Sequence, residues 1–379
     1  MIRELVALLI APATLDGFAR ALLALAAARP TVERELTQPR RWLVVIPARD
    51  EGTGVRDTIA SVNAAALNSN VRTILLLDGN DAEAAAVAHE TRIEVFVKEP
   101  AGPSKGAALE WLSRQPAARL DESDAVLLLD VGSEVNVRFF DGFRWPAGSD
   151  AGQVFLRSGG IDVGEGAAAS ERLAQSGEDR GRERLGWAVR LRGTGTVLTP
   201  ESFRVLSPRL RTQVEDEEAT LVLSSLGRTV TLARGEAFVI DEKPARWRSA
   251  AGQRARWLAG RMLLFVRQPL AMLRLIARKP AEGLVFVLDL FGRPLSLSVP
   301  LRILAGGGLV IASLMTKSAV WTGWLGTAAV VSGLLDLVHV SRSGVSVRSA
   351  ATMVLAWIGA VLLAPRALLR WIKARDRRS

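Results

Sequence analysis

The chain has 379 residues, of which 49% are hydrophobic, and its formal net charge is +10. This composition is too apolar for an ordinary soluble enzyme and too polar for a protein made only of membrane spans, so we expect a soluble domain joined to membrane segments. The absence of cysteine excludes a disulfide framework and a thiolate metal site, and two histidines far apart in the chain exclude a histidine-rich metal site.

The positive charge lies mainly beside apolar segments, between Arg246 and Arg278 and between Arg366 and Arg378. Basic residues that flank apolar helices are typical of the cytoplasmic side of a membrane. Nucleic-acid binding is not favoured, because the sequence has no basic arm interleaved with aromatic residues. We therefore interpret the charge as a membrane feature.

The first 40 residues contain an apolar stretch from residue 4 to residue 28, interrupted by Asp16 and Arg20. Its length permits either a membrane span or an interfacial helix. It has no clear cleavage site after a short apolar core, so we do not interpret it as a removed signal peptide.

From residue 42 onward, short apolar runs alternate with helical patterns. The predicted strands cover 42–47, 71–77, 92–97 and 125–129, and the predicted helices cover 55–67, 82–89 and 105–114. This alternation indicates βαβ units and a mostly parallel sheet with helices on both faces. In such sheets ligands bind at the carboxyl ends of the strands.

The next segments are less regular. Residues 160–186 show little apolar periodicity, and we interpret them as a mobile or solvated connection. A helix is predicted at 215–226 and a strand at 230–233. Residues 247–276 alternate Arg with large apolar residues, which predicts a pair of basic amphipathic helices along a membrane surface.

Three apolar stretches near spanning length follow, at about 298–316, 319–340 and 350–370. The run Gly306–Gly308 would permit close helix packing. Basic residues stand both before the last stretch, at Arg342 and Arg348, and in the tail after it. Both basic segments cannot be cytosolic if the last stretch crosses the membrane, so the number of spans stays open.

Acidic residues follow three strands of the predicted sheet. Glu51 comes after the first strand, Asp78 ends the second and Asp130 ends the fourth. Each of them alone is explained as a turn residue. Because the carboxyl ends of parallel strands meet at one edge, their recurrence predicts a cluster of carboxylates at a binding site.

Other candidate residues have both a structural and a functional explanation. Lys105 after Ser104 at a helix start fits a phosphate site or a solvated lysine behind a cap. The run 192–195 (RGTG) fits a turn or a close approach of a ligand to backbone. The acids from Glu215 to Glu218 suit a helix N-terminus, and one of them could also act as a base in a cleft. The run 253–257 (QRARW) could hold a diphosphate and stack on a sugar, or lie at a membrane interface.

These motifs occur in a fixed order over about residues 42–260: VVIPARDE (44–51), LLLDGND (75–81), SKGAAL (104–109), LLLDVGS (127–133), VRLRGTGTVLTPESF (189–203), VEDEEATLVLSSLGRTV (214–230) and QRARW (253–257). In this order they resemble the processive-type family 2 glycosyltransferases. That inverting group includes cellulose synthase, hyaluronan and poly-N-acetylglucosamine synthases, and hopanoid-associated transferases.

The resemblance implies a GT-A type α/β fold, with a Rossmann-like, mixed but mostly parallel sheet, flanking helices and C-terminal transmembrane or interfacial helices. We expect an apolar membrane or interfacial segment at 1–40, a glycosyltransferase domain at 41–245, basic interfacial helices that carry QRARW at 246–280, and a transmembrane region with a basic tail at 281–379. The partners would be a nucleotide-sugar donor, with UDP as the expected nucleotide, a lipid or glycan acceptor and the membrane, with no nucleic acid. The location would be a bacterial inner membrane with a cytosolic catalytic domain.

The resemblance also implies residue roles. Asp216 would be the general base that deprotonates the acceptor hydroxyl. Asp130 would be the first acid of an Asp-x-Asp motif that binds Mg²⁺ or Mn²⁺. The nucleotide sugar would be bound by Pro47, Ala48, Glu51, Asp78, Lys105 and Asp130, and the diphosphate and acceptor region by Glu215, Gln253, Arg256 and Trp257.

Two departures from the family pattern bear on this interpretation. Gly132 stands where the second acid of Asp-x-Asp belongs, and Glu134 is the nearest replacement. After Asp78, Asp81 is close to the usual acid position, which Ala82 occupies. A degenerate, non-catalytic membrane scaffold is therefore the alternative hypothesis. A transporter is poorly supported, because the spans are few and Asp336 is the only clear midplane acid.

Overall fold

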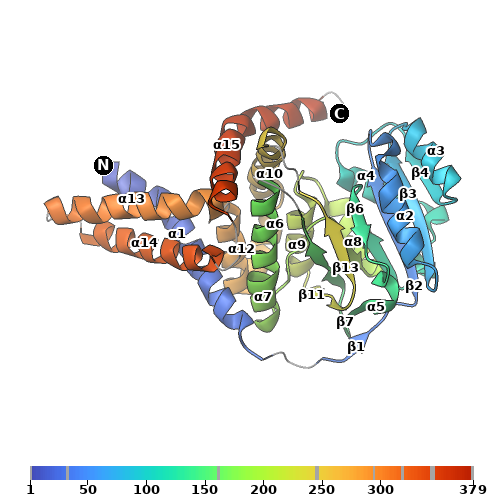
Figure 1. Ribbon diagram of the computed structural model, residues 1–379, viewed down its shortest axis with the longest axis horizontal. Coiled ribbons are helices and arrows are strands. Elements are labelled where there is room, and N and C mark those ends of the chain that lie inside the picture. The colour runs from blue at the N-terminus through green and yellow to red at the C-terminus, as the bar shows by residue number, and fades with distance from the viewer. Residues whose placement is uncertain are drawn as a thin grey trace.

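The structure is a computed structural model that describes residues 2–30, 34–159, 163–243, 247–292, 295–316, 320–341 and 346–376. The expectations for Arg246, for the segment around Arg342 and for the last residues of the basic tail lie outside these ranges. An α/β domain stands at one end of the molecule and a group of long helices extends from it (Figure 1).

A seven-stranded mixed sheet forms the centre of the α/β domain, in the order β11-β8-β10-β5-β2-β3-β4. Its strands are β2 (Arg41–Ala48), β3 (Asn70–Asp78), β4 (Glu94–Lys98), β5 (Ala125–Leu128), β8 (Ala151–Gln153), β10 (Thr196–Leu198) and β11 (Val230–Leu232). Strands β5, β2, β3 and β4 are parallel, whereas β10 is antiparallel to both of its neighbours. The predicted mixed, mostly parallel sheet is therefore confirmed.

The remaining strands form two small sheets. One contains β1 (Leu36–Thr37), β7 (Phe143–Pro146) and β12 (Arg234–Gly235), and the other contains β6 (Ser133–Val135), β9 (Phe155–Arg157) and β13 (Phe238–Asp241). Pairing of β6 with β13 holds the segment after β5 in place. This segment carries Gly132 and Glu134.

The central sheet is covered on both faces, because successive side chains of a strand point to opposite sides. Val44 and Ile46 pack with α2 (Val55–Ala65) and α3 (Ala82–Glu90) on one face. Leu43 and Val45 pack on the other face with α4 (Lys105–Ser113), α8 (Pro200–Leu206) and α9 (Glu215–Ser225). The short α5 (Phe139–Gly142) and 3₁₀ turns at Gly52–Gly54, Pro116–Ala118, Leu120–Glu122 and Ser207–Arg209 connect these elements.

The predicted connection at 160–186 is wrong over the residues that the structure describes. These residues form α6 (Val163–Leu173), a π-helical segment (Ala174–Asp179) and α7 (Arg180–Arg184). Two of their charged side chains are buried and paired: Arg182 with Asp289, and Asp179 with Arg192. Because ion pairs replace apolar contacts here, the sequence lacks the hydrophobic period that marks most buried helices.

Three helices are long and apolar enough to cross a membrane: α1 (Ile2–Ala27), α13 (Leu295–Thr316) and α14 (Val320–Ser341). They pack on one another and extend away from the domain (Figure 1). The remaining helices are α10 (Trp247–Arg267), α11 (Pro269–Arg278), α12 (Pro280–Gly292) and α15 (Val347–Asp376). Helix α15 packs along α10, and its apolar part, Ala351–Arg366, is shorter than the other three.

Candidate active site

Asp78 is held at the carboxyl end of β3. It is buried, and its Oδ1 accepts a hydrogen bond of 2.5 Å from the backbone N–H of Gly102. Its Oδ2 lies 3.3 Å from a guanidinium nitrogen of Arg49, and the ammonium of Lys98 lies 3.8 Å from Oδ1. The carboxylate is therefore compensated by two cations, while Pro47 and Ala48 end the adjacent strand β2.

The loop after β2 is tied to the start of α3 by Asp81. Its Oδ2 accepts backbone N–H bonds of 3.0 Å from Glu51 and 2.9 Å from Gly52, and its Oδ1 caps α3 at Ala84. Burial raises the pKa of the Glu51 carboxyl, and the negative charges of Asp81 and Asp130 raise it further. The predicted cluster of carboxylates at this edge is thus present.

Asp130 follows β5 and forms an ion pair with Lys105 at the start of α4. Burial alone would lower the pKa of Lys105, but the carboxylates of Asp130, Glu215 and Asp216 raise it above its usual value. Lys105 is therefore a permanent positive charge between the sheet edge and α9. The Ser104 side chain accepts the backbone N–H of Ala107 and caps α4. The motif therefore serves both as a helix cap and to place Lys105 at the site.

The 192–195 loop closes over Asp130. The Thr194 hydroxyl accepts the backbone N–H of Asp130 at 3.2 Å. A Cβ on Gly193 would lie 3.4 Å from Asp130 Oδ2, and Gly193 has a φ of +78°. This loop belongs to the site as well as being a turn, because it lets backbone approach the acid closely.

The four acids at the start of α9 have different surroundings. Glu218 is buried and accepts the backbone N–H groups of Arg211 and Thr212 at 2.7 and 2.8 Å, so it is structural. Glu217 pairs with Arg261. Glu215 and Asp216 are left to face the site.

Both of these carboxyls are perturbed by their surroundings. Burial raises the pKa of Glu215 to about 7, against the opposing effect of Lys105. Burial also raises the pKa of Asp216 to about 6, and the charge of Glu217 acts in the same direction. Asp216 Oδ1 accepts the backbone N–H of Glu217 at 2.9 Å, which orients the carboxylate. At neutral pH Asp216 is largely ionised yet more basic than an exposed aspartate.

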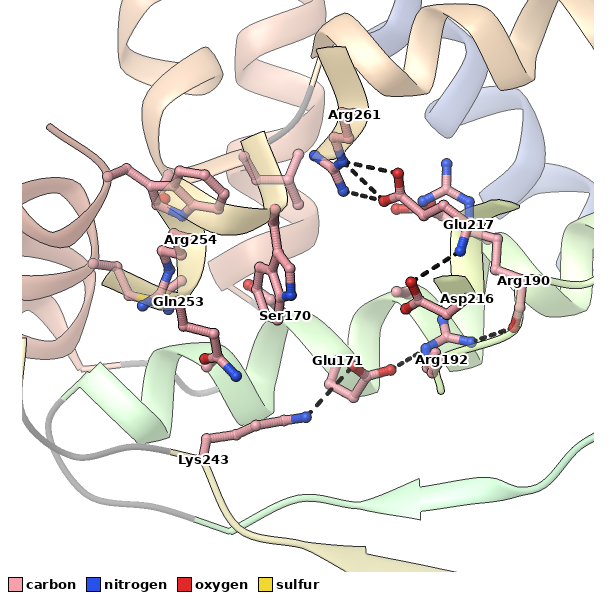
Figure 2. A pocket seen from close by; sticks show the side chains of 18 of the residues that line it. Ser170, Glu171, Arg190, Arg192, Asp216, Glu217, Lys243, Gln253, Arg254 and Arg261 are labelled. Atoms are coloured by element: carbon pink, nitrogen blue, oxygen red, sulfur yellow. Dashed lines mark hydrogen bonds and ion pairs between the residues drawn. The ribbon is translucent and has the colours of Figure 1, made fainter. Parts of the chain in front are cut away.

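Asp216 lines a cavity of about 220 Å³ between the domain and helices α6, α10 and α15 (Figure 2). Gln253 and Trp257 of the QRARW motif line the same cavity. Arg256 does not; it is exposed and borders a neighbouring surface depression. Arg254, which sequence reasoning passed over, lines the cavity instead.

The position of Arg254 follows from helix geometry. At about 100° per residue, positions 253, 254, 257 and 261 of α10 fall within one face, and position 256 falls outside it. The helical phase of the motif was thus the signal that could have found Arg254. Arg192, from the singled-out run 192–195, also lines the cavity, whereas Glu171 was missed because it lies in a segment that no motif covers.

A divalent cation would find one carboxylate at the expected place. The Asp130 side chain is 45% exposed, and a Cβ on Gly132 would meet nothing within 4 Å. Within the described residues, no group of three or more His, Asp or Glu side chains could hold a metal. Glu134 is exposed while its neighbours in β6 are buried. A cation bound mainly by substrate phosphates fits this arrangement, because Mg²⁺-type sites use one or two carboxylates plus phosphate oxygens.

The chain matches no protein-family profile and no curated protein. Among solved structures, a mannosyltransferase from Pyrobaculum calidifontis in complex with GDP-Man and Mn²⁺ is similar, with a TM-score of 0.55 and 12% identity, over 96% of this chain and 98% of that one. Glucosyl-3-phosphoglycerate synthase from Mycobacterium tuberculosis, in complex with Mn²⁺, UDP and its product, covers 65% of this chain and 82% of its own, with 19% identity and a TM-score of 0.38.

The first of these matches bears on the fold, because it spans nearly the whole of both chains. Because 96% of this chain is covered, the matched length includes the sheet and most of the apolar C-terminal helices. The chain therefore has the GT-A fold with additional apolar C-terminal helices, as the motifs predicted.

Proposed function

We propose that this protein is an inverting family 2 glycosyltransferase that moves a hexose or N-acetylhexosamine from a nucleotide sugar to a lipid or glycan acceptor. The observation that carries the proposal is Asp216. It lines a cavity next to the carboxylate and lysine cluster of the sheet edge, with a pKa raised to about 6. A base needs a pKa below the working pH but not far below it, and Asp216 meets this condition.

In this mechanism the donor lies along the sheet edge. Pro47, Ala48, Glu51 and Asp78 would bind the nucleoside, and Lys105 would bind the diphosphate. Asp216 takes the proton of the acceptor hydroxyl, and that oxygen attacks the anomeric carbon on the face opposite the diphosphate. The bond to the diphosphate breaks, and the sugar is transferred with inversion.

A divalent cation, if bound, would be held by Asp130 together with the donor, and it would neutralise charge on the diphosphate. Lys105 would also neutralise charge on the diphosphate, because its ammonium forms an ion pair with Asp130 and so lies at the same place. On the acceptor side we assign Gln253 and Trp257 to the cavity wall, with Glu215 between donor and acceptor. Arg256 would act from the neighbouring surface.

The membrane part of the proposal rests on α1, α13 and α14, which have the length and composition of spans. Nucleotide sugars are made in the cytosol, so we place the domain on the cytosolic face of a bacterial inner membrane. The basic helices α10 and α11 would lie against that face, where positive residues are favoured.

The test is sugar transfer by purified protein in detergent, with labelled UDP-sugars and with GDP-Man, which is the donor in the similar mannosyltransferase structure. We expect Asp216→Asn to lower turnover by about 10²- to 10⁴-fold while donor binding is kept, because only the base is lost. Asp121→Asn is the matched control, since its side chain is 84% exposed on a turn outside the cavity.

Transfer that is unaffected by Asp216→Asn would overturn the base assignment. If no donor turns over and calorimetry detects no UDP or GDP binding, the scaffold hypothesis is favoured instead. Parallel assays with Mn²⁺ and with EDTA determine whether the cation is needed.

A further inference from the structure

Arg254 is a buried cation that forms no ion pair with a carboxylate among the residues that the structure describes. Its side chain lies between α10 and α15 and is 4% exposed. Its Nη2 lies 3.1 Å from the sulfur of Met353, and its guanidinium carbon lies 5.5 Å from the ring centre of Trp357. Its Nη1 has no hydrogen-bond partner within the part of the chain that the structure describes. Burial lowers the pKa of Arg254 to about 10, so the guanidinium is still charged at neutral pH.

The other cations that line the cavity differ from Arg254 in this respect. Arg192, Arg261, Arg190 and Lys243 each form an ion pair with an acidic residue. In Figure 2, Arg190, Arg192 and the Arg261–Glu217 pair lie around Asp216, while Arg254 lies beside Gln253 on the opposite side of the view. A buried charge without a counter-ion destabilises a fold unless a ligand supplies the opposite charge.

Two further polar groups at this cavity lack a partner. The indole Nε1 of Trp357 is buried without a hydrogen bond among the described residues, and so is the Oγ of Ser296. Both residues line the cavity with Arg254. An indole N–H and a guanidinium are pure donors, and a hydroxyl can also donate. This set of donors suits an acceptor-rich anion such as a phosphate group.

The walls around these donors are apolar and adjoin the membrane helices. Met353 and Trp357 come from α15, and Leu295 is the first residue of the candidate span α13. Nearby, Met262 and Val266 on α10 are 55% and 73% exposed. A ligand that reaches this cavity from the membrane side would keep an apolar chain against these surfaces.

We propose that Arg254, Trp357 and Ser296 form a binding site for the phosphate of an amphipathic acceptor, whose apolar chain extends toward α13 and the membrane. The identification of the ligand as the acceptor rests on the proposed function; the phosphate site itself does not. The cavity of about 220 Å³ suits a head group, while the chain would lie outside it.

The experiment uses the full chain in dodecyl maltoside micelles, titrated with dodecyl phosphate and, separately, with inorganic phosphate. We expect dodecyl phosphate to bind and Arg254→Met to weaken this binding at least about tenfold, since a charge-assisted hydrogen bond is lost. Trp357→Phe keeps the ring but removes the N–H, and should weaken binding less. Arg274→Gln, an exposed arginine of α11, should leave it unchanged.

Thermal unfolding separates a ligand site from a structural role. Without ligand, we expect Arg254→Met to unfold at a higher temperature than wild type, because an uncompensated buried charge is removed. A lower unfolding temperature together with unchanged binding of dodecyl phosphate would overturn the proposal. If Arg254→Met fails to fold, Arg254→Lys and Trp357→Phe carry the binding test.

The remaining outcomes identify the ligand. Inorganic phosphate that binds as tightly as dodecyl phosphate would show a free phosphate site and overturn the amphipathic part. Loss of UDP binding in Arg254→Met would assign Arg254 to the donor diphosphate and overturn the acceptor part. If dodecyl phosphate binds through Arg254 but no sugar is transferred, this site stands and the proposed function fails.

Discussion

Asp216 and Glu217 are neighbours in sequence, yet the protein gives their carboxylates different surroundings. Arg261 neutralises Glu217 through contacts of 2.9 and 3.0 Å from its Nε. Asp216 forms no ion pair within the described ranges and accepts a backbone N–H instead. The charge of Glu217 therefore raises the pKa of Asp216, while Arg261 lowers it. Burial is the main cause of the raised pKa of the proposed catalytic group, and this adjacent ion pair adjusts it.

The pH dependence of transfer follows from that balance. We expect the rate to rise from pH 5 to pH 7 with an apparent pKa near 6, as Asp216 becomes ionised. Arg261→Gln removes the cation that stabilises the ionised form and leaves Glu217 uncompensated, so the rise should move to higher pH. A pH–rate profile of kcat/KM measures both, with Arg274→Gln as the control that should not move it.

The contribution of Asp216 to stability depends on pH in the opposite direction to the transfer rate. Because the pKa of Asp216 is raised in the folded state, the folded protein binds the proton more tightly than the unfolded chain does. Its contribution to the free energy of unfolding is fully present below about pH 4, the usual aspartate pKa, and is lost as pH rises through about 6. A pH–rate profile of Arg261→Gln that coincides with that of wild type would contradict the coupling of Asp216 to the Glu217–Arg261 pair.

At the residue scale, sequence motifs predicted the sheet-edge cluster well. Glu51 and Asp130 lie near one another, and Asp78 ends the strand beside β2, because strand order and carboxyl-end geometry follow from local alternation. The helical phase of the motif could place Arg254 on the face of α10 that carries Gln253 and Trp257, but it could not predict its surroundings, which come from α15, about a hundred residues later in the chain. Tertiary contacts of that kind leave no local pattern.

Among the helices and strands, too, those with a local apolar pattern were predicted and those shaped by tertiary contacts were not. Strands and helices of the central sheet fall close to their predicted ranges, because buried parallel strands read as continuous apolar runs. The π-helical segment and its flanking helices at 163–184 were not predicted, since their buried faces hold ion pairs and small residues. Gly181 illustrates the reason: a Cβ there would lie 2.1 Å from the backbone oxygen of Leu23 in α1.

The predicted close packing at Gly306–Gly308 is confirmed for one residue of the run. A Cβ on Gly306 would lie 2.7 Å from the backbone oxygen of Gly326 in α14, whereas one on Gly308 would meet nothing within 4 Å. We expect Gly306→Val to separate α13 from α14 and destabilise the protein by about 1–3 kcal/mol. Gly308→Ala should be neutral or stabilising by up to about 1 kcal/mol.

Thermal unfolding in one detergent compares the two variants. Equal unfolding temperatures for Gly306→Val and wild type would show that this helix contact does not contribute to stability. A loss in Gly308→Ala as large as that in Gly306→Val would mean that any bulk on α13 is harmful, and would contradict the specific contact.

At the scale of the whole molecule, buried charges connect the three candidate spans near the domain. Arg20 of α1 contacts Asp336 of α14 at 2.8 Å and pairs with Asp16, and Arg302 of α13 pairs with Asp336. The two positive and two negative charges compensate one another, and the ion pairs join the three helices.

The opposite ends of these helices also meet. Arg3 near the start of α1 donates to Thr316 at the end of α13 with a distance of 2.6 Å. Helix α1 therefore begins away from the domain and ends beside it, while α13 leaves and α14 returns (Figure 1). A helix of 22 residues is about 33 Å long, enough for a hydrocarbon core of about 30 Å.

This arrangement resolves the conflict between the basic residues on either side of the last apolar stretch. Helix α15 packs along α10 and contacts α6, which are parts of the domain side. If α15 lies at the interface and does not cross, Arg348 and Arg366 share the cytosolic side, as positive residues prefer. We therefore predict three spans, with the N-terminus outside and the C-terminal region inside.

The absence of cysteine in the chain allows a clean test of this topology by single-cysteine labelling in intact cells. Ile2→Cys and Met315→Cys lie at exposed positions on the far ends of α1 and α13, and should react with an impermeant maleimide. Arg366→Cys and the domain control Glu90→Cys should react only after the membrane is opened. If Arg366→Cys reacts in intact cells while Glu90→Cys does not, α15 crosses the membrane. Part of the Asp216 cavity would then be lined by a helix within the bilayer, because Met353 and Trp357 of α15 line it. The interfacial placement of the acceptor site would be wrong.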